Sequence, residues 1–277
     1  MRLFGWLSYN NYETEIIIYH RLSIHTVDTI MSGIANLRVH IAPVGFEIDR
    51  IVIPAKEMKV DRVWLLVHDN TAEDKGRPYV EKIQNQLKKA DIKVEISKVN
   101  RLELFKIIRA VIDIVEKEKR NDIYVNVASG SKIHAIACMM ACMILRKQKK
   151  ITPFYAEAER YAAFEGVQQS SGVKKMMSLP TYEIQTPKQE LITALNIIRE
   201  KGGKITKKEM AQLAEDAKII TVGAREENYE QARFASLDKN IIQPLSDHWK
   251  FVEVEKIGRN RWIKITEAGS QAAEFLI

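Results

Sequence analysis

Cysteine is scarce in this sequence, because its 277 residues include only Cys138 and Cys142. This shortage argues against a framework of structural disulfides, and the spacing of four residues matches neither a zinc knuckle nor a CxxC redox pair. The six histidines show no spacing typical of metal ligands, so we predict no structural metal. We expect two buried thiols in a protein of the reducing cytoplasm.

Long hydrophobic runs are also missing. No apolar stretch approaches the length of a membrane-spanning helix, so we expect no membrane partner. Residues 1–36 show no clear periodicity and lack the basic and apolar regions of a signal peptide. We interpret them as an N-terminal extension, and we suggest Met31 as the natural start, with residues 1–30 an upstream translation.

The fingerprints of common nucleotide-cofactor enzymes are absent as well. The turn after the first predicted strand has no GxGxxG motif, the chain has no Walker A loop, and no catalytic dyad is visible. An enzyme that uses a nucleotide cofactor is therefore disfavoured, and we predict no cofactor.

The residues that are present suit a folded protein of two domains, with 46% hydrophobic content. The formal net charge of +7 suggests an acidic partner. Residues 187–277 hold 15 basic and 14 acidic residues, so most of the surplus lies in the first 186 residues. We expect an anionic ligand to bind there.

Strand and helix patterns alternate from residue 37 onward. The pattern predicts strands at 37–43, 62–67, 92–99, 123–127 and 151–155, and helices at 46–58, 79–90, 102–119 and 131–146. Such alternation is typical of a Rossmann-like α/β domain with a mostly parallel sheet, here predicted over residues 37–185. An antiparallel edge hairpin is predicted from 174–177 and 182–184, turning at Leu179-Pro180.

A different pattern begins near Thr186, which we expect to cap a helix with Pro187 at its first position. A second helix from Thr206, opened by a Thr-x-x-Glu capping box, runs to about Asp216, and a third segment spans about 227–245. Two strands around the turn 258–260 and a closing helix from Thr266 follow. Residues 186–277 are therefore predicted to form a winged helix-turn-helix domain.

The most informative segment is the loop Ser129-Gly130-Ser131-Lys132, which joins an apolar strand to an apolar helix. Small residues allow close approach of the backbone to a ligand, and the helix start and Lys132 supply positive charge. The alternative is an ordinary turn capped by Ser129 or Ser131. A second loop, after the first strand, offers Gly45 for close approach, Asp49 for a ribose hydroxyl or base amino group, and Arg50 for phosphate. For Asp49 and Arg50 the alternative is an ion pair on a solvated helix face.

The helix after this loop, Ile133–Leu145, is apolar nearly all round. Such a helix must be covered on more than the side that faces its own sheet, which favours a homodimer interface along it. The alternative is that the C-terminal domain covers it.

Basic residues of the second domain are our candidates for contacts with double-stranded DNA: Lys207, Lys208, Arg225, Arg233, Arg259 and Arg261. The nearly neutral charge of this domain keeps a second interpretation open, in which the winged helix binds protein or dimerises.

Two motifs carry a resemblance to a known family, HIAPVGFEIDRIVIPA and NVASGSKIHAIACMMAC, and a winged helix follows them. The chain resembles, over residues 37–277, the archaeal CARF-domain transcriptional regulators, in which a CRISPR-associated Rossmann-like domain precedes a DNA-binding winged helix. The resemblance implies a CARF dimer that binds cyclic oligoadenylate, often the tetramer, across its twofold axis. It assigns ligand contacts to Val44, Gly45 and Phe46 in the first loop, and to Ser129, Gly130, Ser131 and Lys132 in the second.

The second loop departs from the Thr-Gly-Gly-Thr-Lys-like turns of many CARF domains, which leaves the ring size of the ligand open. The resemblance thus predicts a ligand-controlled transcription factor. An alternative is slow ring nuclease activity at the same site, in which Ser131 and Lys132 stabilise the transition state. The operator, the sign of regulation and the fate of the ligand are not given by the sequence.

Overall fold

The computed structural model describes residues 36–277 except 71–73, 148–149 and 163–167. The predicted extension and the start at Met31 lie outside the described residues. Within the described part, a six-stranded sheet has the order β3-β2-β1-β4-β5-β8. Its strands are β1 (Arg38–Pro43), β2 (Arg62–His68), β3 (Lys93–Val99), β4 (Asp122–Asn126), β5 (Ile151–Glu157) and β8 (Lys175–Ser178).

The sheet is parallel from β3 to β5, as the strand–helix alternation predicts. Successive strands β1, β2 and β3 extend it in one direction, and β4 and β5 extend it in the other. The order therefore reverses between β1 and β4. These two strands pair in parallel, and the pairing begins with Arg38 opposite Asp122. This switch point is the place where open α/β sheets bind ligands.

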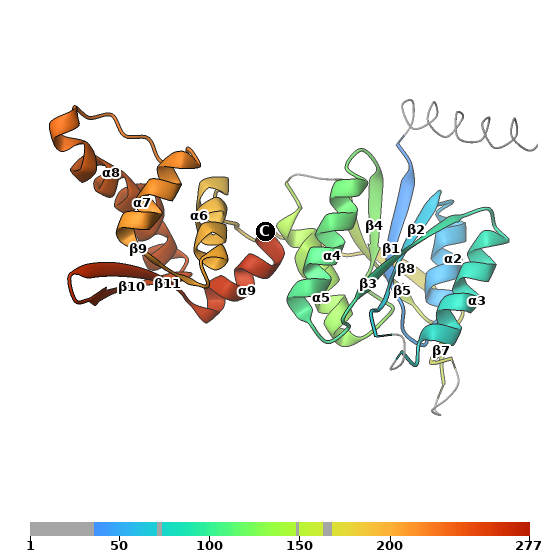
Figure 1. Cartoon of the computed structure of the whole chain (residues 1–277). Helices are drawn as coiled ribbons and strands as arrows, with labels where there is room; N and C mark the ends of the chain where they lie inside the picture. Colours follow the sequence, from blue (N-terminus) through green and yellow to red (C-terminus); the bar gives the residue numbers. More distant parts are fainter. Residues whose placement is uncertain (1–35, 71–73, 148–149, 163–167) are drawn as a thin grey trace, which may run out of the picture.

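Two helices cover each face of this sheet (Figure 1). On one face lie α2 (Asp49–Glu57) and α3 (Arg77–Lys88), and on the other lie α4 (Leu104–Lys117) and α5 (Lys132–Ile144). The helix α4 shows why the sequence folds this way, since its buried residues recur on one side: Ile107, Ile108, Val111, Ile114 and Val115. Burial of each such side chain contributes about 1.5–3 kcal/mol of transfer free energy.

Two sequence expectations for this domain were wrong. Helix α2 begins at Asp49 rather than Phe46, because residues 44–48 form the loop that meets Gly130. The predicted hairpin between 174–177 and 182–184 is not formed. Instead β8 pairs antiparallel with β5, where Tyr155 lies opposite Met177, and residues 179–188 are irregular.

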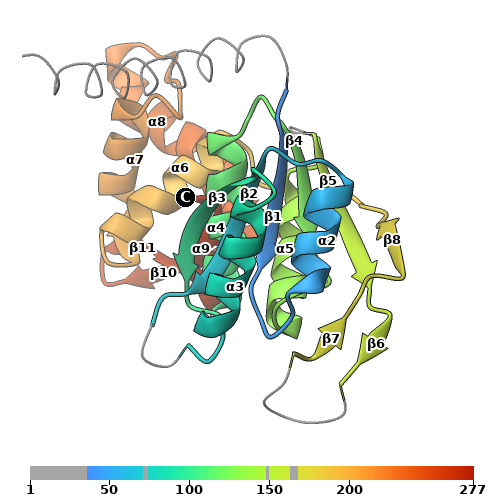
Figure 2. The same ribbon diagram turned by 90° about the vertical axis from the view of Figure 1, so that its right-hand side faces the viewer.

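A short two-stranded ribbon, β6 (Arg160–Tyr161) and β7 (Ser170–Ser171), extends beyond the carboxyl ends of the parallel strands, where the loop after β1 also lies (Figure 2). The Gln169 N–H donates to the Phe46 carbonyl at 3.2 Å, and the Gly172 N–H donates to Asp49 Oδ2 at 2.9 Å. The ribbon is therefore attached to the loop that precedes α2.

The second domain is a winged helix, as predicted. It contains α6 (Gln189–Glu200), β9 (Lys204–Thr206), α7 (Lys207–Asp216), α8 (Tyr229–Leu237), β10 (Val252–Ile257), β11 (Asn260–Ile265) and α9 (Glu267–Leu276). The strands form one sheet in the order β10-β11-β9. Thr206 caps α7, accepting a hydrogen bond from the Glu209 N–H at 3.2 Å, which agrees with the predicted helix start.

Two details of this domain differ from the expectation. The N-cap of α6 is Lys188, not Thr186, so the first helix starts later. The third segment is not one regular helix, because α8 continues through two π-helical turns that end at His248. The proposed domain boundary at residue 186 falls within the irregular segment 179–188 and stays a prediction.

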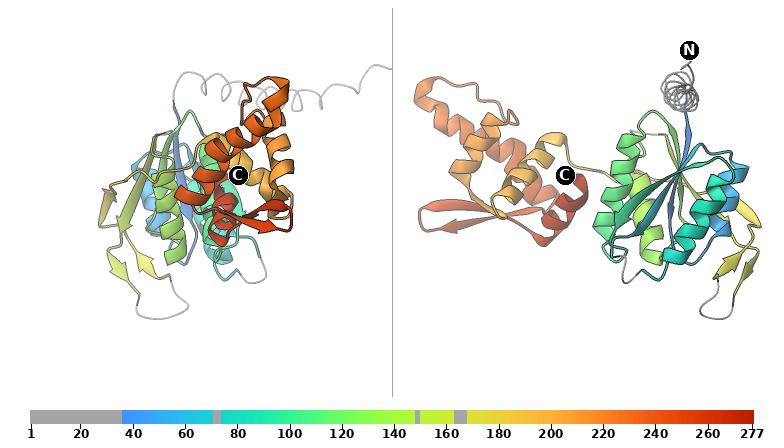
Figure 3. Two further views of the ribbon diagram at one scale, coloured as in Figure 1. Left: turned by 90° about the vertical axis from the view of Figure 1, so that its left-hand side faces the viewer. Right: turned by 45° about the vertical axis from the view of Figure 1, so that its right-hand side comes forward.

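The two domains touch through α9 and α4 (Figure 3). The rings of Phe105 and Phe275 are stacked, with centroids 5.8 Å apart and planes inclined by 13°. Phe105 lies in the first turn of α4, directly after the end of β3. The winged helix is thus attached to a helix that starts at the end of the sheet where the loops after β1 and β4 lie.

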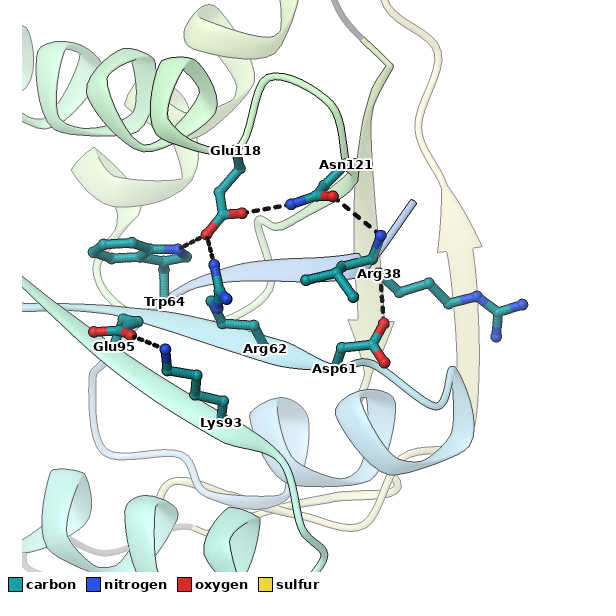
Figure 4. A network of polar contacts seen from close by, with 9 residues as sticks. Arg38, Asp61, Arg62, Trp64, Lys93, Glu95, Glu118 and Asn121 are labelled. Atoms are coloured by element: carbon teal, nitrogen blue, oxygen red, sulfur yellow. Dashed lines mark hydrogen bonds and ion pairs between the residues drawn. The ribbon is translucent and has the colours of Figure 1, made fainter. Parts of the chain in front are cut away.

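At the amino ends of the parallel strands, a polar network connects β1 and β2 to the end of α4 (Figure 4). Buried Glu118 accepts hydrogen bonds from Arg62 at 2.6 Å, Trp64 Nε1 at 2.8 Å and Asn121 at 2.6 Å. Burial alone acts to raise the pKa of Glu118, but these hydrogen bonds outweigh it and lower the pKa.

Replacing Glu118 by Ala is expected to lower the free energy of unfolding by about 2–3 kcal/mol, because Arg62 and Trp64 lose a shared acceptor. Chemical denaturation at pH 7 measures this. The control is Glu81→Ala, which removes an exposed ion pair with Arg77 and should cost under about 0.5 kcal/mol.

The pH dependence gives a second test, with Glu118→Gln. Since the folded-state pKa of Glu118 is lowered, the difference in unfolding free energy between wild type and Glu118→Gln should persist at neutral pH and shrink as the pH falls below about 4. A difference that does not change with pH would contradict this assignment.

Candidate functional site

The loops after β1 and β4 meet at the switch point. A Cβ atom placed on Gly45 would lie 3.1 Å from the Gly130 Cα, and a Cβ on Gly130 would lie 2.7 Å from the Pro43 Cβ. Gly130 also has a φ of +78°, a conformation that residues with a side chain rarely adopt. The close contact between the loops therefore requires glycine at both positions.

Asn126 holds the second loop in place. Its side-chain amide donates to the Arg50 carbonyl at 2.7 Å, and its Oδ1 accepts from the Ala128 N–H at 2.8 Å. The Asn126 side chain is buried, so these bonds are protected from water. One residue thereby links the first turn of α2 to the loop that starts α5.

Helix α5 starts with a reciprocal cap. Ser131 Oγ accepts from the His134 N–H at 3.3 Å, and His134 Nδ1 accepts from the Ser131 N–H at 3.2 Å. Because Nδ1 accepts a hydrogen bond, the neutral ring carries its proton on Nε2. Burial, together with the charges of Arg101 and His68, lowers the pKa of His134 to about 4. The imidazole is therefore neutral at physiological pH.

The loop presents one buried and two exposed hydrophilic side chains. Ser131 and Lys132 are exposed at the start of α5, whereas Ser129 is buried and its hydroxyl has no hydrogen-bond partner among the described residues. Unpartnered buried hydroxyls are uncommon and are often found at functional sites. The predicted segment 129–132 thus combines a free hydroxyl, a helix start and an exposed ammonium group.

Arg50 and Asp49, predicted as contacts for phosphate and ribose, are engaged within the protein. Arg50 is buried, donates from Nε to the Ala156 carbonyl at 2.8 Å, and lies over the ring of Tyr155. Its guanidinium thus packs against β5, and its role as a phosphate contact stays a prediction. Asp49 accepts the hydrogen bond from Gly172 described above and so holds the ribbon. Neither residue forms the ion pair on a solvated face that was the alternative.

Glu47 belongs to the site but was missed by the sequence analysis. Its side chain is 8% exposed and lies next to Gly45, and Arg50 Nη1 is 3.9 Å from its Oε1. Burial raises the pKa of Glu47, against the charge of Arg50 and hydrogen bonds from backbone groups that include Gly130. The sequence could not predict a carboxylate at this candidate anion site, because the position of Glu47 depends on how both loops fold.

Further groups from neighbouring elements surround the two loops. Arg101 follows β3 and His68 is the last residue of β2, and both lie near enough to His134 to lower its pKa. The ring of Phe46 packs edge-on against Tyr79 at 5.5 Å between centroids. Arg101 and Tyr79 were missed by the sequence analysis. The cationic side chain of Arg101 and an aromatic pair therefore lie near the glycine loops.

The exposed face of α5 is not covered by the winged helix. Ile136 remains 53% exposed, and Met139 and Met143 on the same side are partly exposed. The segment 179–188 covers only the end of this helix, where the Ile184 N–H donates to the Met143 carbonyl at 3.4 Å. As predicted, Cys138 and Cys142 are buried, and burial raises the pKa of Cys138 to about 12.

The candidate DNA contacts fall into two groups. Lys208, Arg225, Arg259 and Arg261 are exposed. Lys207 instead pairs with Asp238 at 2.5 Å, and Arg233 is buried against Gln212 and Glu215 with further contact to Glu230. Arg233 therefore holds α8 against α7, and its role as a DNA contact stays a prediction. The sequence could not show this burial, because Gln212 and Glu215 come from another helix.

A mostly parallel sheet with glycine loops at its switch point, joined to a winged helix, defines a Rossmann-like α/β domain fused to a winged helix-turn-helix. This confirms the predicted fold class. In family comparisons, residues 38–161 match the model described as "HFX_2341_N:-like, N-terminal", and residues 190–277 match the "DUF6293 C-terminal winged helix domain". The chain thus combines an N-terminal domain and a C-terminal winged helix of these two kinds.

A curated relative is the "Uncharacterized protein MJ1513" of Methanocaldococcus jannaschii, which is 25% identical over 206 residues. The alignment covers 64% of this chain and 61% of the relative, so the chain spans less than two thirds of that protein.

Solved structures show weaker similarity. Csm6 of Enterococcus italicus, bound to cyclic hexa-2′-fluoro-hexa-dAMP, has a TM-score of 0.38 and 11% identity, covering 77% of this chain and 56% of that chain. Can2 of Sulfobacillus thermosulfidooxidans, in complex with cyclic tetra-adenylate, has a TM-score of 0.38 and 14% identity, covering 86% and 63%. These values are too low to place a ligand in this chain. None of the helices in the described ranges is long and apolar enough to cross a membrane.

Gly130→Ala is expected to lower the free energy of unfolding by at least about 3 kcal/mol, because strain at positive φ adds to a collision with Pro43. Gly202→Ala is a matched control, since Gly202 has the same φ of +78° but no atom within 4 Å of an added Cβ. The control should lose only about 1–2 kcal/mol in denaturant titrations. Equal losses for the two variants would show that the loops are not in close contact.

Proposed function

We propose that this protein is a cytoplasmic DNA-binding regulator that responds to an anionic second messenger of the cyclic oligoadenylate class. The observation that carries the proposal is the junction of the two glycine loops at the start of α5, in a chain that also has a winged helix. Val44, Gly45 and Phe46 would contact the ligand from one loop, and Ser129 to Lys132 would contact it from the other.

The chemistry of this edge suits a phosphate-containing ligand with bases. The exposed Lys132, the start of α5 and nearby Arg101 favour negative charge. The Phe46–Tyr79 pair offers apolar ring surface at which a base can stack. The choice of cyclic oligoadenylate, with the tetramer first, follows from the family resemblance of the two loops.

A homodimer completes the proposal. The exposed stripe of Ile136, Met139 and Met143 runs along α5, directly behind the loop that carries Lys132. Pairing of two copies along this stripe would bury the stripe and bring two anion sites to one cleft. A cyclic ligand with twofold symmetry matches two equivalent sites.

The contact between Phe105 and Phe275 gives ligand binding a way to influence DNA binding. Phe105 follows Arg101 by four residues, so movement of the edge loop toward a phosphate would shift the first turn of α4. Helix α9 packs on that turn and belongs to the winged helix. The ligand changes DNA affinity only if it binds the two arrangements with different affinities.

Lys132→Ala is expected to weaken binding of cyclic tetraadenylate by about tenfold or more without unfolding the protein, because it removes an exposed charge beside the phosphate site. Calorimetry measures the affinity, after a thermal-shift screen against cyclic tri-, tetra- and hexaadenylate. The control is Lys88→Ala, which replaces an exposed lysine at the end of α3, away from the two loops, and should bind the ligand as wild type does. Unchanged affinity in Lys132→Ala would remove this loop from the site.

For DNA binding we propose the exposed basic residues Lys208, Arg225, Arg259 and Arg261, of which the last two lie at the tip of the wing. Lys207 retains a place beside them at the start of α7, although its ammonium group is paired. The segment 226–230, which leads into α8, is acidic, with Glu226, Glu227 and Glu230. We therefore expect phosphate contacts from the wing to supply much of the affinity.

Arg261→Ala is expected to weaken binding of duplex DNA and to reduce the slope of log Kobs against log salt by about one. Fluorescence anisotropy at several salt concentrations measures both, and repeating the titration with cyclic tetraadenylate tests whether the ligand changes DNA affinity. Arg233→Ala provides the contrast, since it should lower the stability of the domain and leave the slope unchanged. A winged helix that binds only protein would show no such salt slope.

A second candidate function is slow cleavage of the same ligand. The observation that favours it is the 2.9 Å separation between Ser131 Oγ and His134 Nδ1, with the imidazole neutral. Cleavage requires the ribose 2′-hydroxyl in line with its phosphate, and Ser131 and Lys132 would stabilise the developing charge. Incubation of labelled cyclic tetraadenylate with the protein, followed by chromatography, separates sensing from cleavage.

A further inference from the structure

Glu47 places a carboxylate at the junction where the proposed site would hold a phosphate. Its Oε2 is 2.8 Å from the position that a Cβ on Gly45 would occupy, and the same position lies 3.3 Å from the Gly130 nitrogen. The carboxylate therefore lies between the two loops and not on the surface of α2. A negative group is buried where backbone N–H groups and a helix start would otherwise attract an anion.

This carboxylate is only partly compensated. Backbone N–H groups of Phe46, Glu47 and Gly130 and the charge of Arg50 act to lower its pKa, but burial outweighs them. Its buried Oε2 makes no hydrogen bond of normal geometry to the residues that the structure describes. The nearest cation, Arg50, is 3.9 Å from Oε1, and its Nε is already bonded to the Ala156 carbonyl. A buried charge with partial compensation is costly, and addition of a phosphate nearby would bring a second negative charge into the same region.

The charged groups around Glu47 do not remove this conflict. From its own segment come Arg50 and Asp49, and Asp49 is engaged with the ribbon. From the second loop come Lys132, which is exposed, and His134, whose pKa of about 4 keeps it neutral. From the segment before α3 come Asp74 and Lys75, of which Asp74 is bonded to the Gly76 N–H beside Gly45.

We propose that Glu47 is a built-in competitor for the anionic ligand, whose carboxylate must be neutralised or displaced before a phosphate can bind between the two loops. This inference rests on the proposed function and adds a way in which ligand affinity is regulated. Glu47 sets how much ligand is needed, and it makes ligand binding favour proton uptake. Burial raises the pKa of Glu47, so the proton is taken up more readily than by an exposed carboxyl group.

The test compares wild type with Glu47→Gln, which keeps the shape and removes the charge. Calorimetry with cyclic tetraadenylate at pH 5.5, 6.5 and 7.5 should show wild-type affinity that rises as the pH falls. Glu47→Gln should bind about tenfold more tightly than wild type at pH 7.5 and should lose most of the pH dependence. Glu57→Gln, an exposed position at the far end of α2, is the control and should behave as wild type.

Weaker binding by Glu47→Gln would overturn the proposal, since Glu47 would then be a hydrogen-bond acceptor for the ligand. Equal ligand affinity of wild type and Glu47→Gln at every pH would also overturn the proposal. If wild type binds no cyclic oligoadenylate, the proposed function fails, and the same comparison is made with inorganic tripolyphosphate as the probe.

Thermal unfolding without ligand shows whether the charge is buried. Because the folded-state pKa is raised, ionised Glu47 destabilises the fold increasingly as the pH rises through that pKa, and the penalty is absent at low pH. Glu47→Gln should therefore melt higher than wild type at pH 7.5, with the difference shrinking toward pH 5. A variant that is more stable but does not bind anions more tightly would mean a buried carboxylate without a competing role.

Discussion

The close contact of Gly45 with Gly130 is the constraint on which the rest of this structure depends. Strands β1 and β4 are parallel neighbours, so their loops leave the same edge side by side. Without side chains at the two glycines, the loops approach closely enough for Asn126 to bind the backbone of α2. This contact sets the position of α5, and with it the hydroxyls and the ammonium group of the 129–132 loop.

The same contact accounts for the distribution of charge. Positive groups such as Lys132 lie outside the junction, where water hydrates them, whereas the carboxylate of Glu47 is enclosed. In the proposed function, an anion that approaches from solvent would be attracted by the outer charges and opposed by the inner one. Its affinity would then depend on both terms, and a change in the protonation or position of Glu47 would alter that affinity.

One layer of helices links all the proposed activities. Helix α5 carries the ligand loop at its start and an apolar stripe along its length, and α4 packs beside it and against α9. In the proposed function, ligand, second copy and winged helix would all contact neighbouring helices of one face, while α2 and α3 cover the other face of the sheet. Because packed helices shift as rigid bodies, a small change where the proposed ligand binds would then be carried to the winged helix.

The sequence by itself determined the alternating sheet and the winged helix, because these follow from periodicity and caps within short segments. It also marked the 129–132 loop and the wing arginines as candidates for binding, and the structure leaves Ser131, Lys132 and these arginines exposed. Only the tertiary structure decided that Arg50 and Arg233 are buried, that Glu47 lies between the loops, and that β8 pairs with β5. The physical reason is that the partner of a charged group or an edge strand lies far away in the chain: Ala156 is 106 residues from Arg50. Local patterns report how a segment folds, whereas burial and pairing of charge depend on what the fold brings beside it.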